Sequence, residues 1–273
     1  RAEQAKDWLE AISKAEAALA LDAENPEARD LLARAESRRE WVNSLGMKFV
    51  QVPGVKALFC VWDTRVQDFK AFMEATGCKI DAPAFSQDTN HPMVNVSWDD
   101  ARAFCDWLTA KERKEGNGGG VSSTQAYRLP SDSEWSRAVG LDEADNGTPG
   151  EKNMKMTGSF PWGGEWPPPP GAGNYAPSLN TDDSTYTSPV GSAEPNQYGL
   201  YDMGGNVWQW CQDFYDATRT NHVLRGGSWA NEGVGYLLSS GRLSAPSGER
   251  APTIGFRIVL EPEEHFLRSL YTE

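Results

Sequence analysis

The spacing of apolar positions divides the chain into two parts. In residues 1–42, apolar residues recur at helical spacing on both sides of a break at Pro26, as at Trp8 and Ile12 and again at Leu31. Because Pro disrupts a helix interior, this part is predicted to form a hairpin of two helices. One hairpin cannot bury its own apolar face, so it is expected to pack against the rest of the chain or against further repeats.

Beyond this hairpin, short apolar runs alternate with Gly and Pro. Thr64 is placed to cap a helix that stops at Gly77, and Ser-x-x-Asp/Glu capping boxes predict further helices after Ser97 and Ser131. The runs "KFVQV", "HVLRGGSW" and "IGFRIVL" are typical of strands. The stretch 140–195 is rich in Gly, Pro and Asp, and an irregular segment of this length is usually functional or fastened by other parts.

The charge of the chain narrows its partners. A formal net charge of −13 argues against nucleic acid, because phosphate binding needs a basic face. No apolar run approaches the ~18 residues of a membrane-spanning helix. The chain starts at Arg1 rather than Met, which favours a trimmed or processed sequence from which a targeting segment can be missing. The cell surface and the cytoplasm both stay open, as does the oligomeric state.

Side chains that carry metal or nucleophilic chemistry are few and scattered. The four cysteines show no C-x-x-C spacing, so a zinc knuckle is not expected, and buried free thiols are favoured over the three possible pairings. The three histidines are too widely separated to suggest an iron-binding triad, and the histidine of "NHPM" is expected to form a structural hydrogen bond. These residues are Cys60, Cys78, Cys105, Cys211, His91, His222 and His265.

Several motifs together resemble one known family. The stretches "NSLGMKFVQVPG", "HPMVNVSWDDARAFCDWL", "YRLPSDSEWSRA", "NQYGLYDMGGNVWQWCQDFY", "VLRGGSW" and "IGFRIV" occur in the order seen in the formylglycine-generating enzyme, or sulfatase-modifying factor, family. The resemblance implies an α+β domain with a C-type-lectin-like fold and long irregular loops over residues 43–260. Residues 1–42 then form a preceding helical hairpin similar to a tetratricopeptide fragment, and residues 261–273 form a C-terminal tail.

The resemblance implies one of three activities. Some members are oxidases with a copper-binding cysteine pair, some are iron oxygenases, and others bind ligands, notably the variable proteins of diversity-generating retroelements. Aligned from "RGGSW", the cysteine pair would stand at Asn231 and Tyr236, which cannot supply a thiolate, and no cysteine follows Cys211. Copper and iron are therefore not expected, and the chain is predicted not to be an enzyme. A metal-dependent oxidase or oxygenase and an inactive adaptor module are the alternatives.

The resemblance also implies a structural calcium site around "YDMGGNVWQ". Its ligands would be the side chains of Asp202 and Gln209 and the backbone carbonyls of Gly205 and Val207. Hard oxygen donors of this kind suit Ca²⁺. Gln209 stands where the family usually has an acid, and the alternative is that Asp202 and Gln209 only satisfy a tight turn.

Residues 225–258 are framed by "RGGSW" and "IGFRI" around a middle rich in small residues. The pattern resembles the variable segment of retroelement-diversified proteins, in which side chains are exchanged on a rigid scaffold. Leu237 and Leu238 are expected to point into the core, and Arg242 and Arg250 to form fixed ion pairs. An unknown protein or other surface ligand is expected to contact the remaining positions. These are Ala230, Asn231, Glu232, Gly233, Val234, Gly235, Tyr236, Gly241, Leu243, Ser244, Ala245, Ser247, Gly248, Glu249, Ala251, Pro252 and Thr253.

Overall fold

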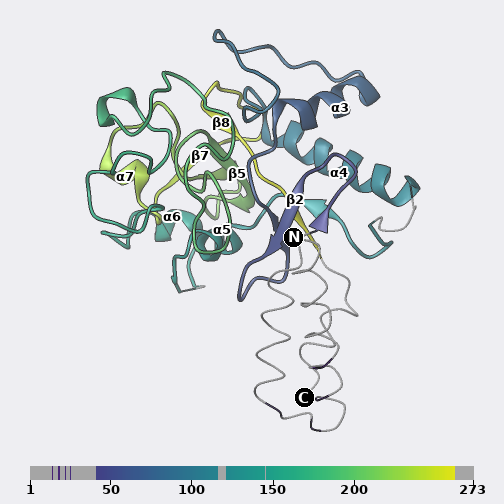
Figure 1. Cartoon of the computed structure of the whole chain (residues 1–273), viewed down its shortest axis with the longest axis horizontal. Coiled ribbons are helices and arrows are strands. Elements are labelled where there is room, and N and C mark those ends of the chain that lie inside the picture. Colours follow the sequence, from purple (N-terminus) through teal and green to yellow (C-terminus); the bar gives the residue numbers. More distant parts are fainter. Residues whose placement is uncertain are drawn as a thin grey trace. The chain divides into compact units, whose positions relative to one another are not determined.

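The computed structural model describes residues 41–115, 121–144 and 146–261, together with the single positions 14, 18, 22 and 25 (Figure 1). The chain divides into two compact units, Arg1–Trp41 and Val42–Glu273. The predicted hairpin and the tail lie almost entirely outside the described residues, and both stay predictions. Within the described part, no helix has both the length and the apolar character needed to cross a bilayer.

The larger of two β-sheets combines strands from both ends of the main unit. Its spatial order is β1-β2-β3-β9-β4, and β9 pairs antiparallel with both β3 and β4. A turn at Gly54 follows β2. Because β9 lies between β3 and β4, strands from the start of the main unit are joined to β4 through a strand from its end. The strands are β1 (Trp41–Val42), β2 (Lys48–Gln51), β3 (Leu58–Cys60), β4 (Tyr127–Arg128) and β9 (Val259–Leu260).

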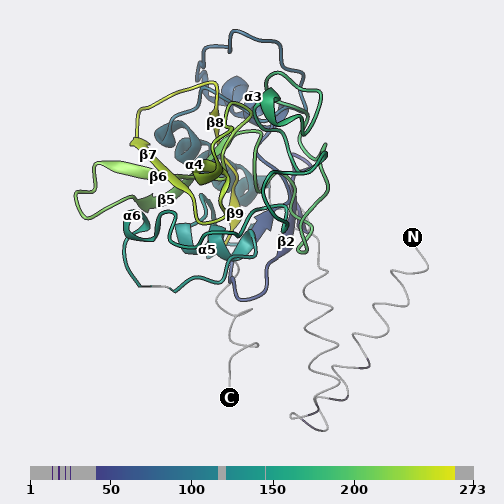
Figure 2. The same cartoon turned by 90° about the vertical axis from the view of Figure 1, so that its left-hand side faces the viewer.

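The second sheet has the order β7-β6-β5-β8 (Figure 2). Strand β6 pairs antiparallel with β5 and β7, whereas β8 runs parallel to β5. The segment 225–258 therefore supplies both edges of this sheet. The strands are β5 (Trp208–Phe214), β6 (Asn221–Arg225), β7 (Arg242–Pro246) and β8 (Ile254–Gly255).

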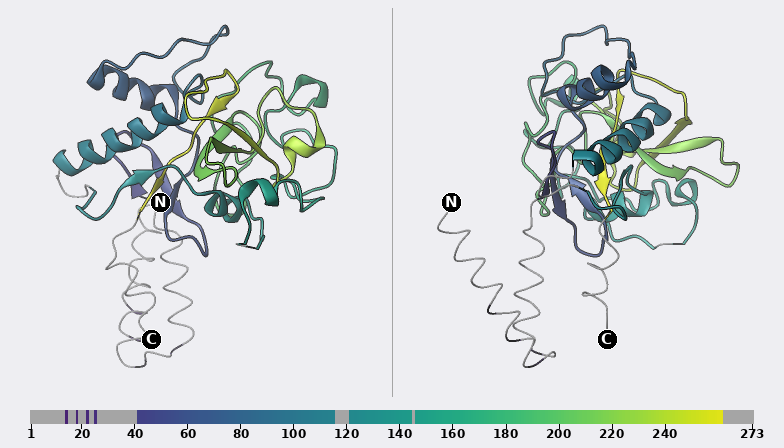
Figure 3. Two further views of the ribbon diagram at one scale, coloured as in Figure 1. Left: turned by 180° about the vertical axis from the view of Figure 1, so that it is seen from behind. Right: turned by 90° about the vertical axis from the view of Figure 1, so that its right-hand side faces the viewer.

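Helices α3 and α4 lie side by side (Figure 3). The predicted capping boxes are confirmed, since Ser97 N donates to Asp100 Oδ2 and Ser131 N donates to Glu134 Oε2, both at 2.8 Å. The predicted stop at Gly77 is also confirmed, with a left-handed φ of 75°. The helices are α3 (Val66–Thr76), α4 (Trp98–Glu115), α5 (Asp132–Ala138), α6 (Pro149–Lys152), α7 (Val234–Leu237) and the 3₁₀ turn η1 (Pro177–Leu179).

The predicted cap of α3 at Thr64 is wrong. Arg65 occupies the N-cap position, and its backbone N–H donates to Asp68 Oδ2 at 3.0 Å. Thr64 is buried instead, where its N–H donates to Phe256 O at 2.9 Å and its carbonyl accepts from Met93 N at 2.8 Å. Contacts with distant parts of the chain thus decide the conformation of Thr64 against its local preference.

The cysteines are free, and most of them are buried. Cys60, Cys105 and Cys211 are buried thiols, as predicted, whereas Cys78 is half-buried. Burial raises the pKa of Cys60 to about 12 and raises the pKa of Cys211 well above its usual value. The neutral thiols therefore serve as small apolar side chains in the core.

Two histidines have structural roles. His91 Nδ1 lies 3.0 Å from Thr187 Oγ1, which confirms the expected hydrogen bond. The His222 ring stacks on Trp98 with ring centroids 3.9 Å apart. His265 lies outside the described residues.

Candidate functional site

A buried ionic cluster fixes the beginning of the segment 225–258. Asp132, the first residue of α5, accepts hydrogen bonds from Arg225 Nη1 at 2.5 Å and from Arg242 Nε and Nη2 at 2.9 and 2.8 Å. Both arginine side chains are fully buried. Burial alone would raise the pKa of Asp132, but the two guanidinium groups lower it to about 2. The expected ion pair of Arg242 is thereby confirmed, and it ties β6 and β7 to α5.

The same arginines hold the chain between β6 and β7. Arg225 Nη2 donates to Ser239 O at 2.7 Å and to Ser136 Oγ at 3.0 Å. Arg242 also forms an ion pair with Glu143. Leu237 and Leu238, just before this point, are buried in the core as predicted.

The end of the segment is fastened by different contacts. Arg250 forms the expected ion pair, with Nε and Nη2 each 2.8 Å from an oxygen of Asp100. The indole N–H of Trp229 donates to Pro252 O at 3.1 Å, and Trp208 N donates to Thr253 O at 2.8 Å. The backbone of the segment is therefore held near both of its ends, and the residues that hold it are not the exposed ones in its middle.

The predicted ligand-binding residues differ in accessibility. Gly241 and Ala245 are buried, so these two belong to the scaffold and not to the surface. At Gly241 a Cβ atom would lie 2.7 Å from Gly235 O, which leaves no room for a side chain. The exposed residues are Ala230, Glu232, Gly233, Val234, Tyr236, Gly248, Glu249 and Pro252. The half-buried residues are Asn231, Gly235, Leu243, Ser244, Ser247, Ala251 and Thr253.

Apolar side chains gather around α7 in what we term the α7 patch: Met154, Met156, Val234 and Tyr236. They are 38%, 37%, 48% and 41% exposed and make up four of the seven exposed large hydrophobic residues in the described chain. The loop that carries the two methionines contacts the chain just after α7. Met154 N donates to Ser240 O at 3.1 Å, and Ser240 Oγ donates to Met156 O at 2.8 Å. Sequence reasoning missed both methionines, and "NMKMTG" carries no periodic signal that would place them there.

A second exposed aromatic group borders the segment near Trp229. The rings of Phe85 and Tyr186 stack with centroids 4.5 Å apart and an interplanar angle of 6°. Trp229 meets both rings edge-on, at 5.7 and 5.1 Å. Tyr186 is exposed, so this platform adds accessible aromatic surface next to the start of the segment.

The two positions expected for a copper-binding pair have different roles. Asn231 Oδ1 accepts from Ser228 N at 3.0 Å and from Ser228 Oγ at 2.8 Å, and Asn231 O accepts from Ala176 N at 3.1 Å. Tyr236 is exposed and packs edge-on against Trp208. Asn231 thus closes a turn, whereas Tyr236 presents its ring to the surroundings.

One of the expected calcium ligands, the side chain of Gln209, does not fit the ion. Gln209 Oε1 accepts hydrogen bonds from Trp135 Nε1 at 2.9 Å and from Arg257 Nε at 3.2 Å. This oxygen already accepts two hydrogen bonds, one of them from a guanidinium group, so Gln209 is a poor ligand for Ca²⁺. Asp202 Oδ2 accepts from Gly191 N at 2.8 Å, and Gln209 Nε2 donates to Asp202 O at 2.7 Å. These contacts favour the alternative, in which Asp202 and Gln209 satisfy a tight turn.

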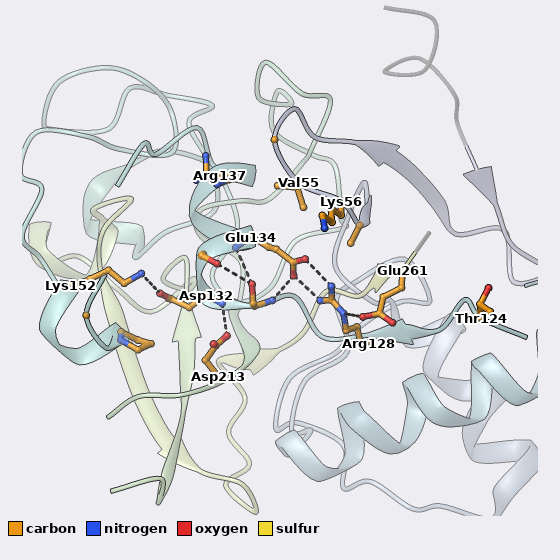
Figure 4. A pocket seen from close by; sticks show the side chains of 16 residues that line it. Val55, Lys56, Thr124, Arg128, Asp132, Glu134, Arg137, Lys152, Asp213 and Glu261 are labelled. Carbon is orange, nitrogen blue, oxygen red and sulfur yellow. Dashed lines mark hydrogen bonds and ion pairs between the residues drawn. The ribbon is translucent and has the colours of Figure 1, made fainter. Parts of the chain in front are cut away.

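A cavity of about 950 Å³ next to the ionic cluster is lined by opposing charges that neutralise one another (Figure 4). Arg128 lies between Glu134, which it binds at 2.7 and 2.8 Å, and Glu261 at 2.7 Å. Lys152 Nζ lies 3.6 Å from Asp132 Oδ2. Most charged groups of this cavity therefore already have partners within the protein.

Known proteins with similar sequences belong to the family whose motifs this chain carries. The Sulfatase-modifying factor enzyme 1-like domain matches residues 34–262. The formylglycine-generating enzyme of Thermomonospora curvata is 30% identical over 206 residues, which cover 63% of this chain and 56% of that protein. The inactive C-alpha-formylglycine-generating enzyme 2 of Bos taurus is 31% identical over 176 residues, which cover 61% of this chain and 49% of that protein. The chain thus spans about half the length of these relatives.

Solved structures share the fold. PvdO from Pseudomonas aeruginosa matches with a TM-score of 0.55 and 21% identity, covering 76% of this chain and 80% of its own. Treponema denticola variable protein 1 matches with a TM-score of 0.54 and 20% identity, covering 82% of this chain and 99% of its own. The expected α+β fold of the formylglycine-generating-enzyme type is confirmed, and the chain belongs to the family of the sulfatase-modifying factor enzyme 1-like domain.

Proposed function

We propose that this chain is a non-catalytic binding protein that recognises another protein through the α7 patch and the exposed residues of 230–253. The observation that carries the proposal is that exposed apolar side chains cluster on a rigidly framed loop and on the adjoining loop of Met154 and Met156. Exposed apolar side chains that adjoining loops bring close together are typical of protein interaction sites. Tyr and Met are also enriched at such sites, and Tyr236 is the expected hot spot.

The positions where oxidases of the family hold their copper thiolates support a role in binding. Asn231 and Tyr236 supply no soft sulfur ligand for Cu(I), and every cysteine of the chain lies before the segment. One relative is named an inactive formylglycine-generating enzyme. A non-catalytic role therefore has a precedent within the family.

The resemblance to variable proteins extends the proposal to exchangeable side chains. Residues such as Glu232, Val234 and Glu249 are exposed, and the ionic cluster at Asp132 is formed without them. Substitutions at exposed positions usually alter stability by less than about 0.5 kcal/mol. The loop would then present different side chains to different partners while the frame stays constant.

Site-specific photo-cross-linking tests the proposal. A benzophenone amino acid placed at position 236 is expected to cross-link one discrete protein in extracts of the source cells. The same group at Val42, which is 50% exposed but lies in the other sheet, is expected to give no such product. Val234→Lys should abolish the product at 236. Copper- or iron-dependent oxygen consumption with a cysteine-containing peptide would instead show an enzyme and overturn the proposal.

A further inference from the structure

A second cavity, of about 510 Å³, differs from the charge-balanced cavity of Figure 4 in the chemistry of its walls. Aromatic and proline residues form much of its lining, namely Phe160, Pro161, Trp162, Pro169, Pro170 and Pro195. None of these belongs to the α7 patch or to the segment 225–258. The volume is suitable for a small molecule or for one long side chain.

The aromatic wall is held in a fixed orientation. Phe160 and Trp162 stack with ring centroids 4.6 Å apart and an interplanar angle of 8°. The Trp162 indole N–H donates to Glu165 O at 3.3 Å, and Tyr175 packs edge-on against the indole at 5.5 Å. Gly204 lets Pro161 approach closely, because a Cβ there would lie 2.5 Å from Pro161 Cγ. A site with walls this rigid loses little entropy when it binds a ligand.

The charged lining residues of this cavity all have the same sign. They are Glu194 and Asp202, and no Lys, Arg or His is found among the lining residues that the structure describes. Glu194 is exposed at the rim, whereas Asp202 is only 7% exposed. Neither forms an ion pair among the described residues. Burial raises the pKa of Asp202, and Arg257, which binds Cys60 O at 2.8 Å and pairs with Asp63 at 3.6 Å, offsets only part of this increase.

We propose that this cavity binds an organic cation, a protonated or quaternary amine with a compact apolar body. An aromatic face attracts such a cation through its quadrupole, and a neighbouring carboxylate adds direct charge attraction. The prolines and Phe160 would contact the apolar part of the ligand. The ligand is either a free amine or a lysine side chain of another protein, since both present the same group.

Titration of the purified protein with matched small ligands tests this site. Choline and n-butylamine are the cationic probes, and 3,3-dimethylbutanol is the neutral analogue of choline with nearly the same shape. Isothermal titration calorimetry and tryptophan fluorescence should show saturable binding of a cation at least about tenfold tighter than the alcohol. Equal affinity for the neutral analogue, or no saturable binding of either cation, would overturn the proposal.

Variants assign the binding to this cavity. Asp202→Asn and Trp162→Leu are each expected to weaken binding of the cation about tenfold, and Glu194→Gln to weaken it by a smaller factor. Asp142→Asn, an exposed acid outside the cavity, is the matched control and should bind as the parent does. Since Glu194 is exposed, its variant stays folded, and unchanged affinity in both Glu194→Gln and Asp202→Asn would place the cation elsewhere.

The two sources of the cation are distinguished by peptides. A short peptide with a single lysine that binds more tightly than n-butylamine, and loses binding on lysine acetylation, indicates a protein side chain. Choline binding more tightly than the peptide indicates a free amine. The site does not depend on the α7 patch, so Val234→Lys should leave amine binding unchanged even where it abolishes partner binding.

Discussion

Replacing Asp132 with alanine is expected to remove a large part of the stability of the domain, because two buried arginines share this carboxylate. Three hydrogen bonds from Arg225 and Arg242, between 2.5 and 2.9 Å long, would be lost together. Removing one partner of a buried ion pair costs about 3–5 kcal/mol, since the remaining charge is left without compensation. Arg225 keeps Ser136 and Ser239 as acceptors, so we expect a loss of about 4 kcal/mol.

Urea unfolding followed by tryptophan fluorescence measures this loss. Arg250→Ala is the matched control, because it removes an ion pair whose arginine is 47% exposed and is expected to cost only about 0.5 kcal/mol. The dependence of the free energy on urea should keep the same slope in both variants. If Asp132→Ala cost no more than Arg250→Ala, the ionic cluster would not be what fixes the segment.

The pH dependence gives an independent check on the same residue. The pKa of Asp132 is about 2 in the folded protein, below the ~3.9 of an unfolded aspartate. The unfolded state therefore binds the proton more readily, so the stabilisation is complete above about pH 4 and is lost as the pH falls through about 2. The advantage of the parent over Asp132→Asn should shrink by about 2 kcal/mol between about pH 5 and pH 2. Parallel pH profiles would contradict the assignment.

Three further predictions concern other parts of the domain. Because burial raises the pKa of Cys60 to about 12, only the half-buried Cys78 should react quickly with a thiol reagent at neutral pH, as mass spectrometry of the labelled protein would show. Gly241→Ala should lower the free energy of unfolding by about 1–3 kcal/mol, whereas Gly248→Ala, with open space around its Cβ, should leave it unchanged in urea titrations. Since Gln209 does not fit Ca²⁺, a chelator should leave the melting temperature of the protein unchanged in calorimetry. A clear decrease would show that the protein binds a stabilising metal ion after all.

Features that depend on neighbouring residues could be predicted from the sequence. The capping boxes at Ser97 and Ser131 and the stop at Gly77 each involve groups within one helical turn, and all three are confirmed. The strand at "HVLRGG" is likewise β6. The prediction that Thr64 caps α3 was wrong because Thr64 N–H donates to the carbonyl of Phe256, a residue far along the chain.

The composition of the candidate site could be predicted only in part. The segment 225–258 was located from its framing motifs, but the α7 patch also needs Met154 and Met156, which come from a loop without periodicity. The role of Asp132 was missed for a different reason. An acidic side chain at the start of a helix is already explained by the helix dipole, so the sequence gives no sign of a distant partner. Only the folded chain brings Arg225 to it.

The two positions of the absent thiolate pair are expected to respond differently to substitution. Asn231→Ser would lose at least one of the hydrogen bonds that Asn231 Oδ1 accepts from Ser228, at a cost of about 1–2 kcal/mol. Tyr236→Ser removes an exposed ring and should cost less than about 0.5 kcal/mol, while abolishing the product that the same cross-linker forms when it is placed at the exposed position 232. Measuring the free energy of unfolding and partner binding for both variants distinguishes a residue that holds the loop in place from one that contacts the partner. Equal losses of stability would mean that Tyr236 also belongs to the frame, and that the exposed positions of the segment cannot be exchanged independently of the fold.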